Sequence, residues 1–191
     1  MNLVFPGITM IEQIARASQP LLQIPVIRRT RRNHGLEHAT ITILSGRLRG
    51  LRMAGRSDAG GYVLLGDIPT DSVEQAAHDA LQRLRNGEPK LAIHPNCGTN
   101  LVTTALLTSV AAMVGLTGAD RRAWFARLPL VMALVIVAGI LSQPLGLSLQ
   151  RHITTDGDPG DLEIKDITRH QVTMPFSSKP MIMHRVNTRS A

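Results

Sequence analysis

The sequence predicts an α+β protein, with a small α/β domain, a two-helix transmembrane hairpin and a short β tail. Residues 31–97 mix helical and strand patterns, two long apolar runs follow, and alternating polar and apolar residues return near the end. We therefore divide the chain into four parts: an amphipathic membrane-surface segment (1–30), the α/β domain (31–97), the hairpin (98–149) and a β tail that docks on the α/β domain (150–191).

Composition supports a membrane protein. Charged residues make up 18% of the 191 residues, below the roughly 25% of soluble domains. The formal charge of +7 suits nucleic acid or an anionic membrane surface equally, so the distribution of apolar residues has to decide between them. The single cysteine excludes an internal disulfide and fits a reducing compartment.

The first 30 residues lack the basic start of a cleavable signal peptide, and Glu12, Arg16 and three prolines interrupt their apolar residues. They predict an amphipathic segment on the membrane surface. The basic run that follows lacks the interleaved aromatic residues of nucleic-acid platforms, so lipid headgroups are the expected partners and nucleic acid is not. The arginines concerned are Arg28, Arg29, Arg31 and Arg32.

The α/β domain is expected to begin with a helix over residues 31–45, ended by Gly46, although "ATITIL" also fits a strand. "LRGLRMAGRSDAGGYVLLG" predicts two strands joined by a turn at residues 57–61. "IPTDSVEQAAHDALQRLRNG" is the clearest helix, capped by Thr70 or Asp71 and stopped by Gly87. "PKLAIHP" predicts a short strand or an extended linker.

Two apolar runs predict the hairpin. Residues 128–149 contain no charge, and a helix of this length crosses a hydrocarbon core of about 30 Å. Pro144 is expected to bend or end that helix. Residues 101–116 form the weaker run because of their threonines. The alternative is a pair of buried helices in a soluble core. Trp124 and Phe125 suit an interfacial anchor in the connecting loop, which also carries three arginines.

The distribution of basic residues predicts the topology. Twelve of the 21 Lys and Arg precede residue 101, six follow residue 149, and three lie in the hairpin loop. This bias assigns both long segments to the cytoplasm of a bacterial inner membrane, with two passes. In the tail, "LEIKDITRHQV" and "KPMIMHRVNTR" predict two strands that pair and dock on the α/β domain, because a lone hairpin is marginal in water.

The motif "HGLEH" carries the candidate chemistry. On a helix, His34, Glu37 and His38 share one face, so two imidazoles one turn apart can bind one zinc ion. The Glu37 carboxylate beside them would be the catalytic base. The alternative is a polar helix face with ordinary hydrogen bonds. Gly35 lowers the stability of the helix by about 1 kcal/mol relative to Ala, which favours a close approach at that position.

A second group of polar residues, "HPNCGTN", precedes the first apolar helix. His94 and Cys97 are both potential zinc ligands, and either completes the site if His34 and His38 bind a metal. A helix amino terminus favours the thiolate of Cys97. The structural alternative has Asn96 or Thr99 as the helix cap.

The order H-x-x-E-H resembles the zinc motif of inverzincin, or pitrilysin-type, peptidases over five residues. That resemblance implies zinc binding by His34 and His38 and a base at Glu37, but not the fold, because the chain is too short for it. Separately, "HGLEHATITIL", "HPNCGTN", "TTDGDPGDLEI" and "HRVNTR" resemble an uncharacterised family of bacterial membrane proteins, cyanobacterial and Chloroflexus-like. This resemblance covers about residues 30–190 and implies an α/β unit plus a membrane hairpin, with no established activity.

Two functions from different classes stay open. The first is a metal-dependent hydrolase acting on a peptide or amide at the membrane, with zinc bound by His34, His38 and either His94 or Cys97. The second is a non-enzymatic accessory or assembly protein in which the same residues form a hydrogen-bonded cluster. The partners expected are the lipid bilayer and a protein or peptide at the membrane, and a homo-oligomer is compatible with the sequence.

Overall fold

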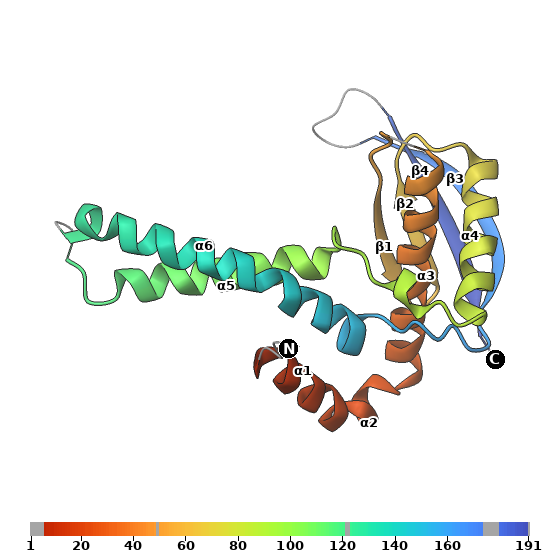
Figure 1. Ribbon diagram of the computed structural model, residues 1–191. Helices are drawn as coiled ribbons and strands as arrows, with labels where there is room; N and C mark the ends of the chain where they lie inside the picture. The colour runs from red at the N-terminus through yellow and green to blue at the C-terminus, as the bar shows by residue number, and fades with distance from the viewer. Residues whose placement is uncertain (1–5, 49, 121–122, 174–179, 191) are drawn as a thin grey trace. The chain divides into compact units, whose positions relative to one another are not determined.

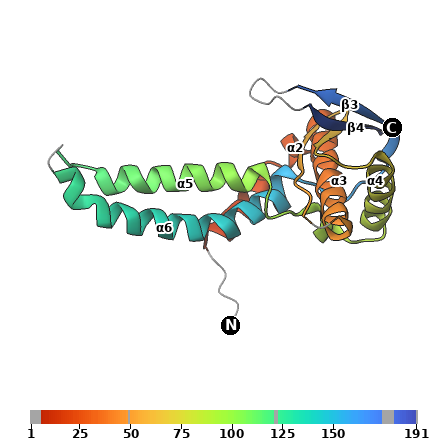
Figure 2. The same ribbon diagram turned by 90° about the horizontal axis from the view of Figure 1, so that it is seen from above.

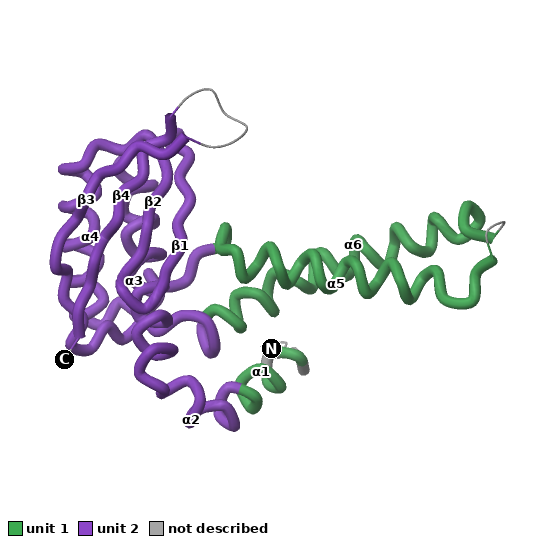
Figure 3. The backbone as a smooth tube through the Cα atoms, turned by 180° about the vertical axis from the view of Figure 1, so that it is seen from behind, with its two compact units in different colours: residues 1–14, 95–150 green, residues 15–94, 151–191 purple. Residues whose placement is uncertain are grey.

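The computed structural model describes residues 6–48, 50–120, 123–173 and 180–190, which form two compact units coloured separately in Figure 3. Unit 1 comprises residues 1–14 and 95–150, and unit 2 comprises residues 15–94 and 151–191. The mixture of helix and sheet, with two apolar helices and a carboxy-terminal strand pair, confirms the predicted fold class.

Unit 2 contains one antiparallel sheet in the order β1-β2-β4-β3. Strands β1 (Ala54–Asp58) and β2 (Gly61–Leu65) form the predicted hairpin, and β3 (Glu163–Val172) pairs with β4 (Met181–Arg189). Strand β4 also pairs with β2, so the tail completes the sheet that begins with β1 and β2 (Figure 1). Side chains of β4 alternate, with His184, Val186 and Thr188 buried, as a half-buried strand requires.

Two helices cover one face of this sheet, as Figures 1 and 2 show from two directions. Helix α3 (Pro25–Arg47) follows the short α2 (Gln19–Leu22), and α4 (Thr70–Arg85) packs beside α3. The core between helices and sheet includes the fully buried side chains Leu36, Leu44, Tyr62, Leu64, Val73 and Leu162.

Helix α3 is longer than predicted because it begins at Pro25, and proline suits the first turn of a helix. Its second half is helical throughout, so the strand alternative for "ATITIL" is wrong. The hydroxyls of Thr40 and Thr42 donate to the carbonyls of Leu36 and His38, one turn earlier, which satisfies these β-branched residues within the helix.

Two local predictions are corrected by the structure, and a third agrees with it. Neither Thr70 nor Asp71 caps α4, because Pro69 occupies the cap position and the Thr70 hydroxyl instead contacts His184 Nε2 at 3.1 Å. "PKLAIHP" is neither strand nor plain linker, since Pro89–Ala92 forms a 3₁₀ turn, η1. Gly87 does end α4, with φ of 86° in the left-handed region that glycine favours.

The basic run at the start of α3 is also corrected. Arg31 and Arg32 are 9% and 6% exposed, so neither is available to lipid headgroups. The segment after α6 covers them: Arg32 pairs with Asp161 at 2.7 Å, and Arg31 donates to backbone carbonyls of that segment. Only Arg28 and Arg29 of the four are partly exposed.

Unit 1 contains α1 (Pro6–Ala17, ending in unit 2) and the two apolar helices, α5 (Gly98–Leu116) and α6 (Ala123–Leu149). Helices α5 and α6 lie side by side along their length (Figures 1 and 2). Helix α6 continues through Pro144 to Leu149 and then widens into a π-helical turn, η2 (Gln150–Thr154). Of the two outcomes expected at Pro144, a bend or an end of the helix, the end is therefore excluded.

Small and polar residues hold α5 against α6. A Cβ at Gly115 would lie 2.8 Å from a Val131 methyl, and one at Gly146 would lie 2.2 Å from Asn100 Oδ1, so both glycines permit close approach. Thr104 and Ser142 share a hydrogen bond of 2.7 Å, and Gln150 donates to Asn100 at 2.8 Å. Trp124 and Phe125 are 52% and 80% exposed, whereas Arg121 and Arg122 lie outside the described residues.

Buried His184 gives unit 2 a predicted acid sensitivity. Burial lowers the pKa of His184, and the positive charge of Arg169, its neighbour on β3, lowers it further. Below about pH 6.5 the unfolded chain therefore binds a proton at this histidine more tightly than the folded chain does. The free energy of unfolding then decreases as the pH is lowered, by up to about 1.4 kcal/mol for each unit of difference between the two pKa values. Above pH 7.5 this contribution is constant.

Chemical denaturation in detergent with a chelator, from pH 8 to pH 5, measures this effect. The variant His184→Leu removes the contribution of this side chain to the pH dependence of stability. Burial also lowers the pKa of His94, but His94 contributes equally in the wild type and in the variant. The pH dependence of the variant is therefore expected to be weaker. Equal slopes in the two proteins would exclude His184 as the source.

Candidate metal centre

The candidate centre is built on one face of α3. His34 and His38 lie one helical turn apart, and their ring centroids are 4.4 Å apart with an interplanar angle of 65°. The His38 side chain is 2% exposed, and His34 is half-buried. The structure therefore brings together the two imidazoles that the sequence predicts, in a setting from which most water is excluded.

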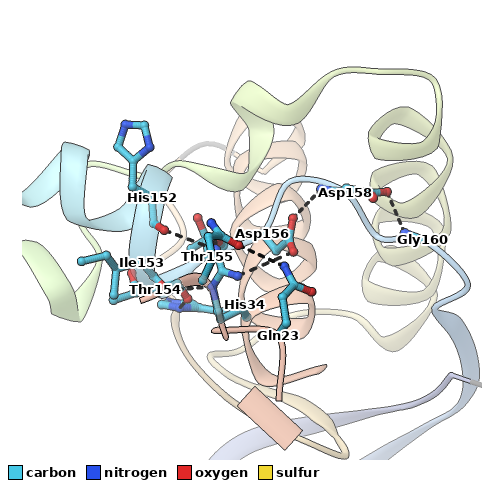
Figure 4. Close-up of polar contacts among 11 residues, drawn as sticks. Gln23, His34, His152, Ile153, Thr154, Thr155, Asp156, Asp158 and Gly160 are labelled. Carbon is cyan, nitrogen blue, oxygen red and sulfur yellow. Dashed lines mark hydrogen bonds and ion pairs between the residues drawn. The ribbon is translucent and has the colours of Figure 1, made fainter. Parts of the chain in front are cut away.

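Backbone carbonyls fix the orientation of both rings. His38 Nδ1 lies 2.8 Å from the Ala92 carbonyl oxygen in η1, and His34 Nδ1 lies 2.9 Å from the Thr154 carbonyl oxygen (Figure 4). Since a carbonyl only accepts, each Nδ1 donates its hydrogen, and each neutral ring carries its lone pair on Nε2. A histidine that binds a metal is held in this way in most known sites.

His94 lies next to this pair in the same unit. Its ring centroid is 6.0 Å from that of His38, at an interplanar angle of 49°. Burial lowers the pKa of His94, and the charge that His38 can carry lowers it further. The neutral form, which is the form that binds metals, is therefore favoured.

Glu37 is held by strand β1 rather than by the segments that hold the two imidazoles. Its carboxylate accepts a short hydrogen bond from the Ser57 hydroxyl, and a Cβ on Gly55 would overlap it. The side chain is 4% exposed, and this burial raises the pKa of Glu37, while the hydrogen bond from Ser57 and the charge that His34 can carry lower it. The carboxylate thus has a fixed partner in a poorly solvated place.

Cys97 belongs to unit 1, where it occupies the N-cap position of α5. Its Sγ accepts a hydrogen bond of 3.4 Å from the Thr99 backbone N–H, so Cys97 takes the capping role expected of Asn96 or Thr99. It follows His94 by three residues, and three residues of chain span at most about 11 Å. The covalent chain therefore limits the distance between the Cα atoms of Cys97 and His94 to about this length.

Several residues around the centre were not identified from the sequence. The Thr154 carbonyl contacts His34, Arg31 binds the carbonyls on either side of Thr154, and Ser57 binds Glu37. For Arg31 the sequence did offer a signal, because the acidic turn "TTDGDPGD" has the opposite charge to the arginines of α3. Ser57 and the Thr154 carbonyl carry no such signal, because any residue supplies a carbonyl.

Fold and site together define a class of protein, in which an α+β unit carrying a pair of oriented imidazoles is joined in one chain to two helices long and apolar enough to cross a membrane. The chain belongs to the family described as Domain of unknown function (DUF6391), whose model matches residues 29–167. This confirms the predicted membership of an uncharacterised bacterial family.

A relative supports the same assignment. An uncharacterised protein of the cyanobacterium Picosynechococcus sp. is 34% identical over 152 residues, which cover 72% of this chain and 70% of that protein. No solved structure matches the chain. The likeness to inverzincin peptidases rests on the five residues of the motif alone.

Proposed function

We propose that this protein is a membrane-anchored metalloprotein that binds one zinc ion between His34 and His38. The observation that carries the proposal is the orientation of both rings, since each Nδ1 is occupied by a carbonyl and each Nε2 presents a lone pair. Two residues with hydrogen-bonded Nδ1, one turn apart on a rigid helix, match the donor set of zinc sites. Metal analysis of the protein purified in detergent tests this directly.

Cys97 is the proposed third ligand and His94 the alternative. Cys97 offers a thiolate, which binds zinc strongly, and its place at the start of α5 favours the ionised form. His94 offers a neutral imidazole near His38. Substitution with cobalt(II) distinguishes them, since only the thiolate gives a sulfur-to-metal charge-transfer band, which Cys97→Ser would abolish.

Metal-dependent hydrolysis of a peptide or amide bond is the proposed reaction. A bound zinc ion would supply Lewis-acid chemistry, and Glu37 would accept the proton of the attacking water. Burial raises the pKa of Glu37, which is the direction that a general base working near neutral pH requires. The hydrogen bond from Ser57 would hold the carboxylate in one orientation.

The variant Glu37→Gln tests this role. The amide has the same shape and still accepts from Ser57, so the fold and the zinc content are expected to persist, while hydrolysis of a casein or fluorogenic peptide library falls by at least about 100-fold. Ser57→Ala serves as the matched control and is expected to lower the rate less. If Glu37→Gln keeps full activity, Glu37 is not the base.

The membrane anchor is supported by α5 and α6. Both helices are long and apolar enough to cross a membrane. Only 11% and 6% of their most apolar 18-residue stretches are buried within the protein, which disfavours the alternative of a soluble core. We propose a bacterial inner-membrane location with both long segments in the cytoplasm, from the basic-residue bias. Resistance to carbonate extraction and a carboxy-terminal topology reporter test these two points.

A non-enzymatic accessory or assembly function is the second candidate. It is favoured by one observation: His34, His38 and Glu37 each have a hydrogen-bonding partner within the protein, as in an ordinary buried polar cluster. Absence of bound zinc in the purified protein, together with unchanged stability on adding zinc, would support this candidate over the first.

A further inference from the structure

Arg31 is buried at the point where the chain returns from α6 to unit 2. Its Nε donates to the Ile153 carbonyl at 2.7 Å, and its Nη2 donates to the Thr155 carbonyl at 3.0 Å. The Arg31 carbonyl accepts from the Asp156 N–H at 3.0 Å, and the two side chains form an ion pair at 3.9 Å. One side chain thus fixes the backbone on both sides of Thr154.

Thr154 is the residue whose carbonyl holds His34. The carbonyls of Ile153 and Thr155 are bonded to Arg31, so the peptide group between them has little freedom to rotate, and its oxygen stays directed at His34 Nδ1. Figure 4 shows this segment running past His34, with Asp156, Asp158 and Gly160 continuing it through further hydrogen bonds. The ring orientation therefore depends on a residue that does not contact the imidazole.

The carbonyls that hold the two histidines share a second property. Ala92 lies six residues before the start of α5 at Gly98, and Thr154 lies five residues after the end of α6 at Leu149. Both therefore belong to the connections between unit 2 and the apolar helices. Each acceptor keeps its place beside the imidazole only where its connection is bound to unit 2, as Arg31 binds the one that carries Thr154.

We infer that Arg31 is a positioning residue of the metal centre: it anchors the chain after α6 so that the Thr154 carbonyl keeps His34 in the Nδ1–H tautomer. The expected effect on zinc affinity rests on the proposed function. The expected effect on the His34 tautomer rests on the hydrogen bonds alone. Removing the guanidinium lets the peptide group at Thr154 rotate. His34 then loses its acceptor, and its proton distributes between both ring nitrogens.

The test compares Arg31→Met with Arg32→Met in the full chain. Arg32 is the adjacent residue, is equally buried, and pairs with Asp161 on the same returning segment, so its loss also loosens that segment without touching the carbonyls beside Thr154. Histidine-ring ¹⁵N NMR of the metal-free protein reads the tautomer of His34, and titration with zinc reads the affinity.

Arg31→Met is expected to shift the His34 ring nitrogens toward a mixed tautomer and to raise the Kd for zinc by about 10- to 100-fold. Arg32→Met is expected to leave the tautomer unchanged and the Kd within about threefold. If Arg31→Met does not fold, Arg31→Lys replaces it, since it keeps the charge but loses the two-pronged geometry, with the same direction expected.

The outcomes separate this inference from the proposed function. A wild-type protein that binds no zinc would overturn the metal site, while the NMR comparison would still decide the role of Arg31. An unchanged His34 tautomer and unchanged affinity in a folded Arg31 variant would overturn the inference. Equal effects of the Arg31 and Arg32 variants would also overturn it, because they would show a general loosening of the segment.

Discussion

Replacing His34 and His38 together by alanine is expected to reduce bound zinc from about one per chain to a background level. The two imidazoles are the proposed ligands that lie on one rigid element, 4.4 Å apart between ring centroids, so their loss leaves too few donors to bind the ion. Elemental analysis of protein purified in detergent, after dialysis against a weak chelator, measures the difference. Each single variant is expected to raise the Kd by at least 100-fold.

The matched control is His78→Ala. His78 lies exposed on α4, in the same unit and outside the centre, and its replacement is expected to leave zinc content unchanged. Thermal unfolding of all variants without metal separates ligand loss from misfolding. Wild-type zinc content in a folded double variant would show that residues other than His34 and His38 bind the zinc.

Gly35→Ala is expected to destabilise unit 2 by about 1–3 kcal/mol or more, as overpacking does in a rigid interior. A Cβ at this position would lie 2.2 Å from the Asp156 carbonyl oxygen and 3.2 Å from the Ala92 Cβ. Both obstacles belong to the segments that hold the histidines, so we also expect weaker zinc binding. The close approach predicted at Gly35 thus has a specific cause, namely the crossing of the returning chain over α3.

Gly46→Ala provides the control within the same helix. No atom lies within 4 Å of a Cβ placed there, so alanine supplies only its better helix propensity and is expected to stabilise by up to about 1 kcal/mol. Denaturant unfolding of both variants beside wild type gives the two signs. A Gly35→Ala protein as stable as Gly46→Ala would mean that the returning chain does not pass over α3 in solution.

Much of the fold was predictable because it depends on local patterns. The Asp and double Gly of the turn at residues 57–61 predicted the β1–β2 hairpin, and alternation of polar and apolar residues predicted strand structure in the tail. Length and lack of charge predicted α5 and α6. The cap of α4 could not be predicted, because Thr70 is recruited by His184, a partner 114 residues away.

The candidate site shows the same division. Helical spacing alone brings His34 and His38 together, since residues four apart share a face. Spacing places Glu37 on the same face of the helix, whereas its hydrogen-bond donor Ser57 is brought to α3 only by the sheet. The arginines were assigned to headgroups from their charge, whereas Arg31 and Arg32 are buried under the returning chain.

The sequence by itself therefore determined α4, α5, α6, the two strand pairs and the pair of imidazoles on one helix face, because periodicity and spacing act over a few residues. Only the tertiary structure decided which atoms of those imidazoles are presented, since the carbonyls of Ala92 and Thr154 reach them from segments 54 and 120 residues away. Hydrogen-bond partners at such separations are set by the packing of the whole unit. Every residue has a backbone carbonyl, so the sequence does not indicate which carbonyl will accept from a given histidine.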